Sequence, residues 1–177
     1  MALTKVRGLG LGNLDENITF STASKGVHLG VTSATASNLL DDYEEGTWTP
    51  SWSGSSGGSA SYSYQVGRYT KIGNRVCANC YLALSNNSLS GSLSLNGLPF
   101  ASASIAQLYH SVSVWINTTT NGGVADGDFF LQGFIDHNGS SSVFLYSLDG
   151  DGGSASFTAS MLTNTTDIMI NMTYQTN

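Results

Sequence analysis

A chain of 177 residues with a formal net charge of −6 is long enough for one domain, or one domain with an appendage, that buries its own core. Only 10% of its residues are charged, against roughly 25% in typical soluble domains, so its polar surface must consist mainly of Ser, Thr, Asn and Gly. Six Lys and Arg residues cannot form the basic stripe that binds a phosphate backbone, which argues against nucleic acid as a partner.

No run of about 18 apolar residues is present, so we expect no membrane insertion. The first residues, Met1–Gly8, lack the apolar stretch and the small-residue cleavage site of a secretory signal, which predicts synthesis in a cytoplasm. The low charge content also leaves little to keep copies of the chain apart. It favours an obligate oligomer, and the alternative is a monomer with a Ser/Thr-rich surface.

Residues 1–40 are predicted to form a thin, extended N-terminal anchoring arm. Glycine alternates with leucine over Arg7–Gly12, which leaves one face of an extended segment bare for another backbone. Short strands are expected at Asn17–Ser21 and Val27–Val31. Such an arm cannot bury its own large side chains, so it is expected to lie on other copies, on the rest of the chain or on another protein, and the alternative is a disordered tail. The candidate contact residues are Leu9, Leu11, Phe20 and Leu29.

Residues 41–46 are interpreted as an acidic hinge after this arm. Four of the twelve acidic residues fall here within five positions, at Asp41, Asp42, Glu44 and Glu45. Such a run is typical of a solvated linker rather than of a catalytic pair. We expect it to form a polar collar where the chains of an oligomer diverge. Tyr43 and Trp48 complete the residues predicted to take part in assembly.

Residues 47–177 are predicted to form a head made of successive strands. Apolar and polar residues alternate along most of its segments, and no helical period lasts more than a turn or two. Eight or more strands at regular spacing, separated by turn residues, predict an all-β, jelly-roll-like β-sandwich. The alternating segments include 62–66, 74–84, 91–96, 110–117, 143–148 and 167–174. Trp115 has the opposite parity to Val112, Val114 and Ile116, which suggests that both faces of that strand are covered.

Cys77 and Cys80 form a C-x-x-C pattern, which can mark a zinc or redox site. On a strand, however, residues three apart point to opposite faces, and no second pair of ligands is present. We therefore expect no metal and no cofactor. Cys80 is predicted to lie in the core and Cys77 on the opposite face, where a subunit contact is one candidate environment.

Paired carboxylates are the one hint of catalysis, because glycosidases use two. Asp126 and Asp128, and also Asp149 and Asp151, lie in glycine-rich turns in which an aspartate commonly bonds its own backbone. A weak calcium site at the second pair is the alternative. We expect a protein that is not an enzyme.

Aromatic residues could stack on sugar rings, although their alternation along the strands favours packing in a core or an interface. The candidates are Trp48, Trp52, Tyr62, Tyr64, Tyr109 and Trp115.

Three short motifs follow one another along the first half of the head: DDYEEGTWTP (Asp41–Pro50), GRYTKIGNRV (Gly67–Val76) and LNGLPF (Leu95–Phe100). In this order they resemble a terminal module found in many bacteriophage tail-fibre and virion-surface proteins. Ala101–Asn177 and the arm share only the general character of that module and none of its motifs. The resemblance implies a homotrimeric β-sandwich displayed on a virion, and it implies no catalytic residue. Tail fibres place such a module after a long shaft, whereas here only the arm precedes it.

The resulting expectation is a structural protein of a tailed phage, a homotrimer anchored by its arm to a major capsid or tail protein. It would act as a capsid decoration (cement) protein or as a short fibre or spike, displayed on the virion surface after synthesis in the host bacterial cytoplasm. The alternative is the host-surface carbohydrate-binding tip of a tail fibre. A polysaccharide depolymerase is a third interpretation, which only the carboxylate pairs support.

Overall fold

The computed structural model describes residues 19–22, 24–30, 39–117, 130–148 and 153–177. The chain divides into two compact units, Met1–Asp41 and Asp42–Asn177. Leu9 and Leu11 lie outside the described residues, as do the two aspartate pairs at 126 and 128 and at 149 and 151.

In the first unit, β1 (Val27–His28) pairs antiparallel with β2 (Leu39–Leu40). The strand predicted at residues 17–21 is not found in its described part, Thr19–Ser21. The described part of this unit contributes none of the buried hydrophobic residues. Its apolar side chains therefore lie at the surface: Phe20, Val27, Leu29 and Leu40 are all exposed.

The second unit is all-β, as the sequence predicts. Its described strands form one ten-stranded antiparallel sheet, and the described helical structure is a single short 3-10 turn, η2 (Ala159–Met161). The strands are β3 (Tyr43–Trp48), β4 (Ser51–Gly54), β5 (Ala60–Ile72), β6 (Arg75–Asn87), β7 (Leu93–Asn96), β8 (His110–Asn117), β9 (Phe130–Ile135), β10 (Ser142–Leu148), β11 (Ser154–Ser156) and β12 (Asp167–Gln175).

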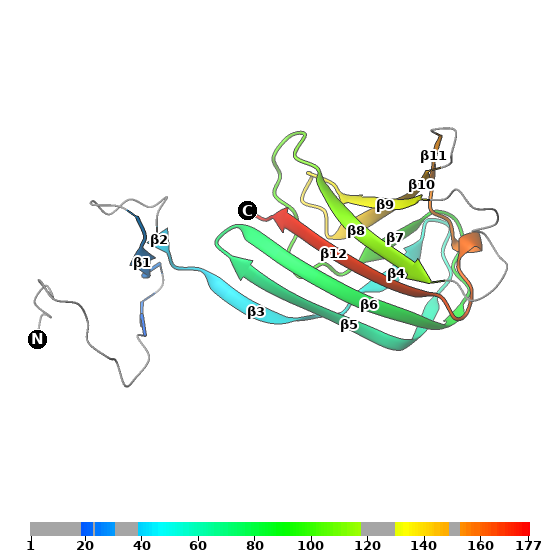
Figure 1. Ribbon diagram of the computed structural model, residues 1–177, viewed down its shortest axis with the longest axis horizontal. Helices are drawn as coiled ribbons and strands as arrows, with labels where there is room; N and C mark the ends of the chain where they lie inside the picture. The colour runs from blue at the N-terminus through cyan, green and yellow to red at the C-terminus, as the bar shows by residue number, and fades with distance from the viewer. Residues whose placement is uncertain (1–18, 23, 31–38, 118–129, 149–152) are drawn as a thin grey trace, which may run out of the picture. The chain divides into compact units, whose positions relative to one another are not determined.

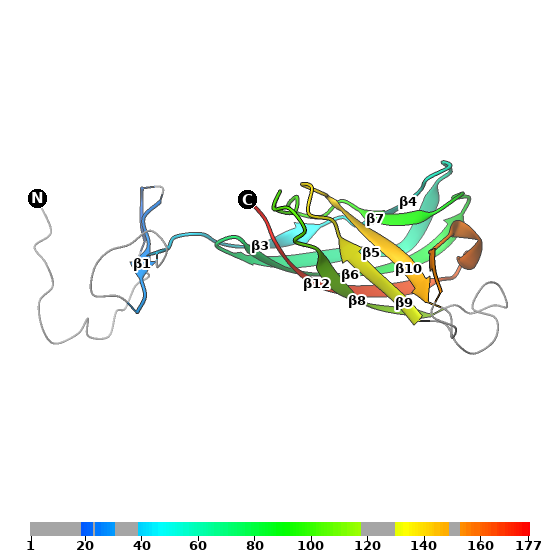
Figure 2. The same ribbon diagram turned by 90° about the horizontal axis from the view of Figure 1, so that it is seen from above.

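The sheet curls on itself. Its strand order is β3-β5-β6-β12-β8-β9-β10-β7-β4, with β11 added beside β10. Consecutive strands β3 and β4 thus stand at opposite ends of the order, which requires the two ends to approach each other. Figures 1 and 2 show the result, in which β4 and β7 lie across from β5, β6 and β12. Where the ends meet, the Trp52 N–H donates to the Tyr62 hydroxyl (2.7 Å) and Gln65 Nε2 donates to the Pro50 carbonyl (2.8 Å).

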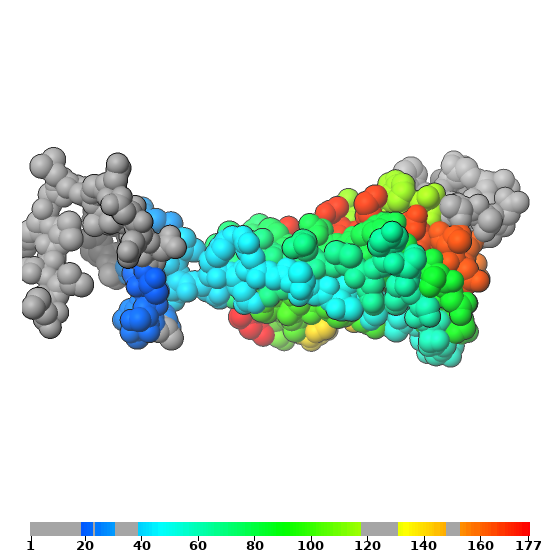
Figure 3. All heavy atoms as spheres, turned by 90° about the horizontal axis from the view of Figure 1, so that it is seen from below, coloured from blue at the N-terminus to red at the C-terminus, as the bar shows by residue number. Residues whose placement is uncertain are grey.

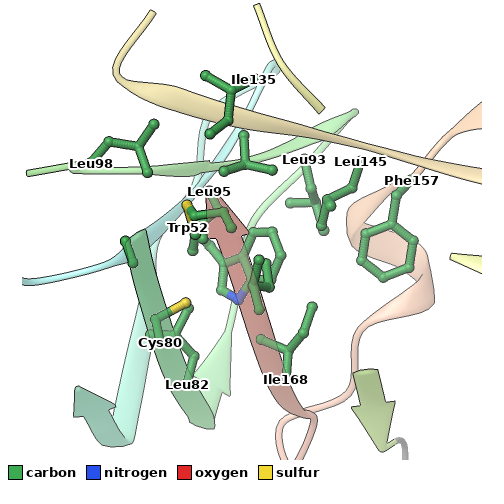
Figure 4. Packing of buried hydrophobic residues seen from close by; sticks show 14 of the residues in the cluster. Trp52, Cys80, Leu82, Leu93, Leu95, Leu98, Ile135, Leu145, Phe157 and Ile168 are labelled. Carbon is green, nitrogen blue, oxygen red and sulfur yellow. The ribbon is translucent and has the colours of Figure 1, made fainter. Parts of the chain in front are cut away.

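The hydrophobic core fills the space between the two layers. Every second residue of the central strands is buried, because successive side chains of a strand point to opposite faces. In Figure 4, Leu95 and Ile135 of one layer face Cys80, Leu82 and Ile168 of the other. The alternating buried positions of β6 and β12 are Val76, Ala78, Cys80, Leu82, Leu84, Ile168, Ile170, Met172 and Tyr174, and the small side chain of Ala83 is buried as well. The alternation predicted for these strands is confirmed.

Two segments differ from the sequence-based expectation. Tyr43–Gly46, expected in a hinge, belongs to β3, whose backbone pairs with β5 from Tyr43 to Trp48. β5 itself is one strand of 13 residues that extends well beyond the alternating segment at 62–66, with a register shift near Tyr62. β3 is an edge strand and lies at the surface, in cyan in Figure 3. Charged side chains on an edge strand discourage pairing with other chains, so here the charge run marks an edge rather than a linker.

Candidate functional site

The first two motifs of the resemblance are held together by two glycine–aromatic pairs. In the register of β3 and β5, Gly46 lies opposite Tyr69, and Trp48 lies opposite Gly67. A Cβ on Gly46 would lie 2.6 Å from the Tyr69 hydroxyl oxygen, and a Cβ on Gly67 would lie 2.6 Å from the Trp48 ring. Each glycine therefore leaves the space that the opposite ring occupies. Trp48, predicted as an assembly residue, is buried in the core.

Asp42 has a structural partner in the second motif. Its carboxylate forms an ion pair with Lys71, whose side chain is nearly buried. The Lys71 ammonium also lies 5.5 Å from the ring centroid of Phe100 in the third motif. The Asp42 carbonyl accepts a hydrogen bond from the Gly73 N–H (2.8 Å). A buried cation needs such a partner, so Asp42 belongs to the head and not to a free collar.

The two glutamates of β3 accept hydrogen bonds from phenols. The Tyr69 hydroxyl donates to Glu44, and the Tyr43 hydroxyl donates to Glu45. These hydrogen bonds raise the pKa of both phenols. Asp41 is exposed. Of the four clustered acids, three thus bond to side chains of the head, and their role as a collar between chains stays a prediction.

Phe100 ties the motifs to the last strand. Its ring meets the Tyr69 ring edge-on, with 5.3 Å between centroids. The hydroxyl of buried Tyr174 donates to the Phe100 carbonyl (2.9 Å) and accepts from the Phe100 N–H (3.3 Å). Burial raises the pKa of Tyr174 to about 12, so this hydroxyl keeps its proton at neutral pH. The motif residues therefore form one continuous set of contacts.

The outer face of β5, β6, β12 and β8, which Figure 1 views from the front, carries an exposed apolar row. Val66, Tyr81, Met169 and Trp115 lie directly opposite one another on these four neighbouring strands. Val66, Met169 and Trp115 are 49%, 41% and 51% exposed, and the ring of Tyr64 lies 6.1 Å from that of Tyr81. We call these five residues the apolar stripe. The expectation that both sides of the Trp115 strand are covered is therefore wrong for the single chain.

Beside the stripe the same face is hollowed into a polar trough of about 1350 Å³. Two rows of cross-strand neighbours cover most of its floor, and Glu45, Arg75 and His110 stand at its borders. Burial lowers the pKa of His110, which keeps this imidazole neutral at pH 7. The two rows are Arg68, Asn79, Asn171 and Ser113, and Thr70, Cys77 and Thr173, and Ser111 of β8 also lines the trough. Hydroxyl, amide and guanidinium groups of this kind bind polar ligands by hydrogen bonds.

A second aromatic group lies on the outer face of β9 and β10. Phe134 stacks on Tyr146 with 5.8 Å between centroids and 16° between planes. It also contacts Phe144 at 5.7 Å and meets Tyr109 edge-on at 5.6 Å. Of the six aromatic residues named above as candidates for stacking on sugars, Trp48 and Trp52 are buried and Tyr62 packs against the core, whereas Tyr64, Tyr109 and Trp115 are exposed.

The two cysteines lie on opposite faces of β6, as predicted. Both thiols are free; Cys80 is buried and Cys77 is exposed in the polar trough. Burial raises the pKa of the Cys80 thiol to about 12.

Among the described residues, no three His, Cys, Asp or Glu side chains gather as metal ligands. Within the same ranges, no helix has the length and hydrophobicity needed to cross a lipid bilayer.

Comparison with known proteins finds one relationship, in the fold. No protein-family model and no curated protein sequence matches the chain. Among solved structures, the fold is similar to part of the crystal structure of Dettilon tailspike protein (gp208), with a TM-score of 0.58 and 18% sequence identity. The match covers 76% of this chain and 24% of that one, so this chain corresponds to about a quarter of the tailspike. At this identity the likeness concerns the fold alone.

Replacing Asp42 with Asn tests whether the acidic segment belongs to the head. Lys71 would keep its charge in a nearly buried position without a counter-ion. Because the Asp42 side chain is 47% exposed, solvent screens part of the effect, and the free energy of unfolding should fall by about 1–2 kcal/mol. Urea unfolding followed by tryptophan fluorescence measures it. Asp41→Asn, an exposed neighbour, is the matched control and should change stability by less than about 0.5 kcal/mol; equal effects of the two substitutions would refute the ion pair's role.

The cysteines should differ sharply in reactivity. At pH 8 a thiol with a pKa of about 12 is only about one part in ten thousand thiolate, the form that reacts. We expect a disulfide reagent to modify one thiol per folded chain quickly, at Cys77, and both thiols in urea. Cys77→Ser should abolish the fast reaction, and two fast thiols in the folded protein would contradict the placement of Cys80.

Proposed function

We propose that the chain is a virion-surface structural protein of a tailed bacteriophage: a homotrimer with a jelly-roll-like head, attached to the particle by its N-terminal segment. It acts as a capsid decoration (cement) protein or as a short fibre or spike. The observation that carries the proposal is the apolar stripe. A row of half-exposed apolar side chains across four strands is a typical contact surface, and it lies on a fold that a phage tailspike shares.

The distribution of exposed apolar residues supports a cyclic trimer. In a ring of three, each contact joins two different surfaces, whereas a two-fold dimer needs one surface that contacts its own copy. The second unit offers two such surfaces on different strands. One is the apolar stripe, and the other is the aromatic group of Tyr109, Phe134, Phe144 and Tyr146. The low charge of the chain also favours close association of copies.

The first unit supports attachment to another virion protein. Its described apolar side chains are exposed, and Val27 of β1 lies directly opposite Leu40 of β2. Two strands of two residues cannot form a core, so these side chains gain most by packing on a partner. A major capsid or tail protein is the partner that a virion-surface role requires.

A host-surface carbohydrate-binding tip is the second candidate function. The polar trough favours it, because hydroxyl and amide side chains line an open surface that an extended ligand could cross. No described feature supports the third interpretation, a depolymerase, since the aspartate pairs in question lie outside the described residues.

Light scattering of the full chain should give three times the chain mass. Met169→Lys places a charge at the centre of the stripe, where burial without a partner costs several kcal/mol, so the trimer should dissociate into folded monomers. Ile105→Lys is the matched control, because Ile105 is also about half exposed but lies outside the stripe. A monomeric wild-type protein would refute the trimer, and a trimer that tolerates Met169→Lys would exclude the stripe as its contact.

Immunogold labelling of intact phage particles tests the virion location. An antibody against the head should decorate the particle surface. Label distributed over the capsid identifies a decoration protein, and label confined to the tail identifies a fibre or spike. Particles that carry no label, while the protein is abundant in the infected-cell lysate, would contradict a structural role in the virion.

A further inference from the structure

We propose that the polar trough binds a segment of an acidic polysaccharide and that Arg68 and Arg75 recognise its carboxylates. This inference rests on the glycan-binding candidate above and gives it a site and a ligand class. It does not depend on the trimer.

The argument begins with the distribution of positive charge. The second unit holds only three basic residues, Arg68, Lys71 and Arg75, against nine acidic ones. Lys71 is nearly buried and bonded to Asp42. The two remaining cations both line the trough, and within the described part of the chain neither guanidinium has a carboxylate partner. A guanidinium is always charged, and its planar fork fits a carboxylate. The second unit is acidic overall, yet its two solvent-facing cations, Arg68 and Arg75, lie on the same surface.

The spacing of the two arginines suits a sparsely charged polymer. Arg75 lies opposite Ile72, four residues along β5 from Arg68. At about 3.3 Å per residue, the two positions are roughly 13 Å apart along the strands. One strand of DNA carries a phosphate about every 3.4 Å and requires a denser row of cations. A polysaccharide with a carboxylate on every second sugar carries charges at intervals closer to the arginine spacing.

The lining between the arginines matches sugar hydroxyls. Asn79 and Asn171 supply amides, and Thr70, Thr173 and Ser113 supply hydroxyls, so the floor both donates and accepts hydrogen bonds. Glu45 is the carboxylate among the described lining residues, and it already accepts a hydrogen bond from Tyr43. The volume of about 1350 Å³ exceeds the roughly 300–1,000 Å³ of small-molecule pockets, which favours a chain segment over a compact ligand.

A second copy of the protein fits the trough less well than a glycan does. The cores of contacts between proteins are poor in charged side chains and rich in apolar ones. The apolar stripe meets that description, whereas the trough beside it is polar and contains two arginines without a carboxylate partner among the described residues. The two neighbouring surfaces therefore suit different partners.

Isothermal titration calorimetry of the full chain tests the inference. The probes are octasaccharides of hyaluronan and of unsulfated chondroitin, which carry a carboxylate on every second sugar, with a dextran octasaccharide as the neutral control and an octaglutamate peptide as the acidic control without sugar. The acidic sugars should bind, and dextran and octaglutamate should bind at least tenfold more weakly. Arg68→Gln and Arg75→Gln should each weaken binding of the acidic sugars about tenfold. Lys25→Gln removes the same charge from the exposed surface of the first unit and should leave binding unchanged.

Each result decides a different point. Binding of acidic sugars that both arginine variants retain would place the site elsewhere and overturn the trough, while the glycan-binding candidate stands. Failure of both acidic octasaccharides to bind would overturn the inference, and binding of dextran in the same experiment would show that the glycan-binding candidate stands without it. Equal binding of octaglutamate would replace the polysaccharide with an acidic protein segment.

Modification of Cys77 supplies an independent measurement, because this thiol lies on the trough floor. The bound octasaccharide should slow the modification several-fold, and dextran should not. A Cys77 thiol that is unreactive in the folded, sugar-free protein but reactive in monomeric Met169→Lys would show that another copy covers the trough, and the inference would fall.

Discussion

The pairing of β3 with β5 is the contact on which the second unit depends. β3 leads through two residues into β4, which lies at the other end of the strand order, so this short connection joins the two ends of the curled sheet. β3 is an edge strand with charged residues, and its pairing needs support from side chains. That support comes from rings lying over glycines, since Tyr69 covers Gly46 and Trp48 covers Gly67. Trp48 also donates to the carbonyl of Asn79 on β6 (3.2 Å), which fixes the edge to the interior of the sheet.

The same contacts explain why the three motifs occur together. Gly97 of the third motif has a φ of +88°, and a Cβ there would lie 2.6 Å from the carbonyl oxygen of Thr49 in the first. Phe100 then receives Lys71 and Tyr69 of the second motif on its ring. Each motif thus supplies space or a partner for another, and in this chain the three motifs form one packing unit.

The parts of the fold that could be predicted are those whose signal lies within one strand. β6 and β12 bury every second residue and β8 half-buries every second one, so their alternation predicted both the strands and the opposite orientation of Cys77 and Cys80. β3 could not be predicted in this way. Only Trp48 among its inward positions is a large apolar residue, and the partners of β3 lie about 20 to 30 residues away on β5, so the local pattern showed charge alone. For the same reason the burial of Trp48 in the core was not foreseen, and its assembly role stays a prediction.

The candidate surfaces depend on register between distant strands. Val66 and Met169 are about a hundred positions apart in sequence, yet they lie on one row because β5, β6 and β12 pair at fixed positions. The parity of Trp115 was the one signal in the sequence, and it indicated a covered face without showing what covers it.

The chemistry of the outer face is a consequence of the core. Burial of Leu82 and Ile170 fixes the register of β6 and β12, because a slip of one residue would turn their apolar side chains outward. With that register fixed, the outward side chains do not affect the core. Successive outward residues of a strand lie two positions apart, so neighbouring cross-strand rows on this face differ in polarity. The row through Tyr81 is apolar, and the next row, through Asn79, is polar and charged. One sheet can thus present an apolar stripe beside a polar trough, and neither requires any change in the packing beneath it.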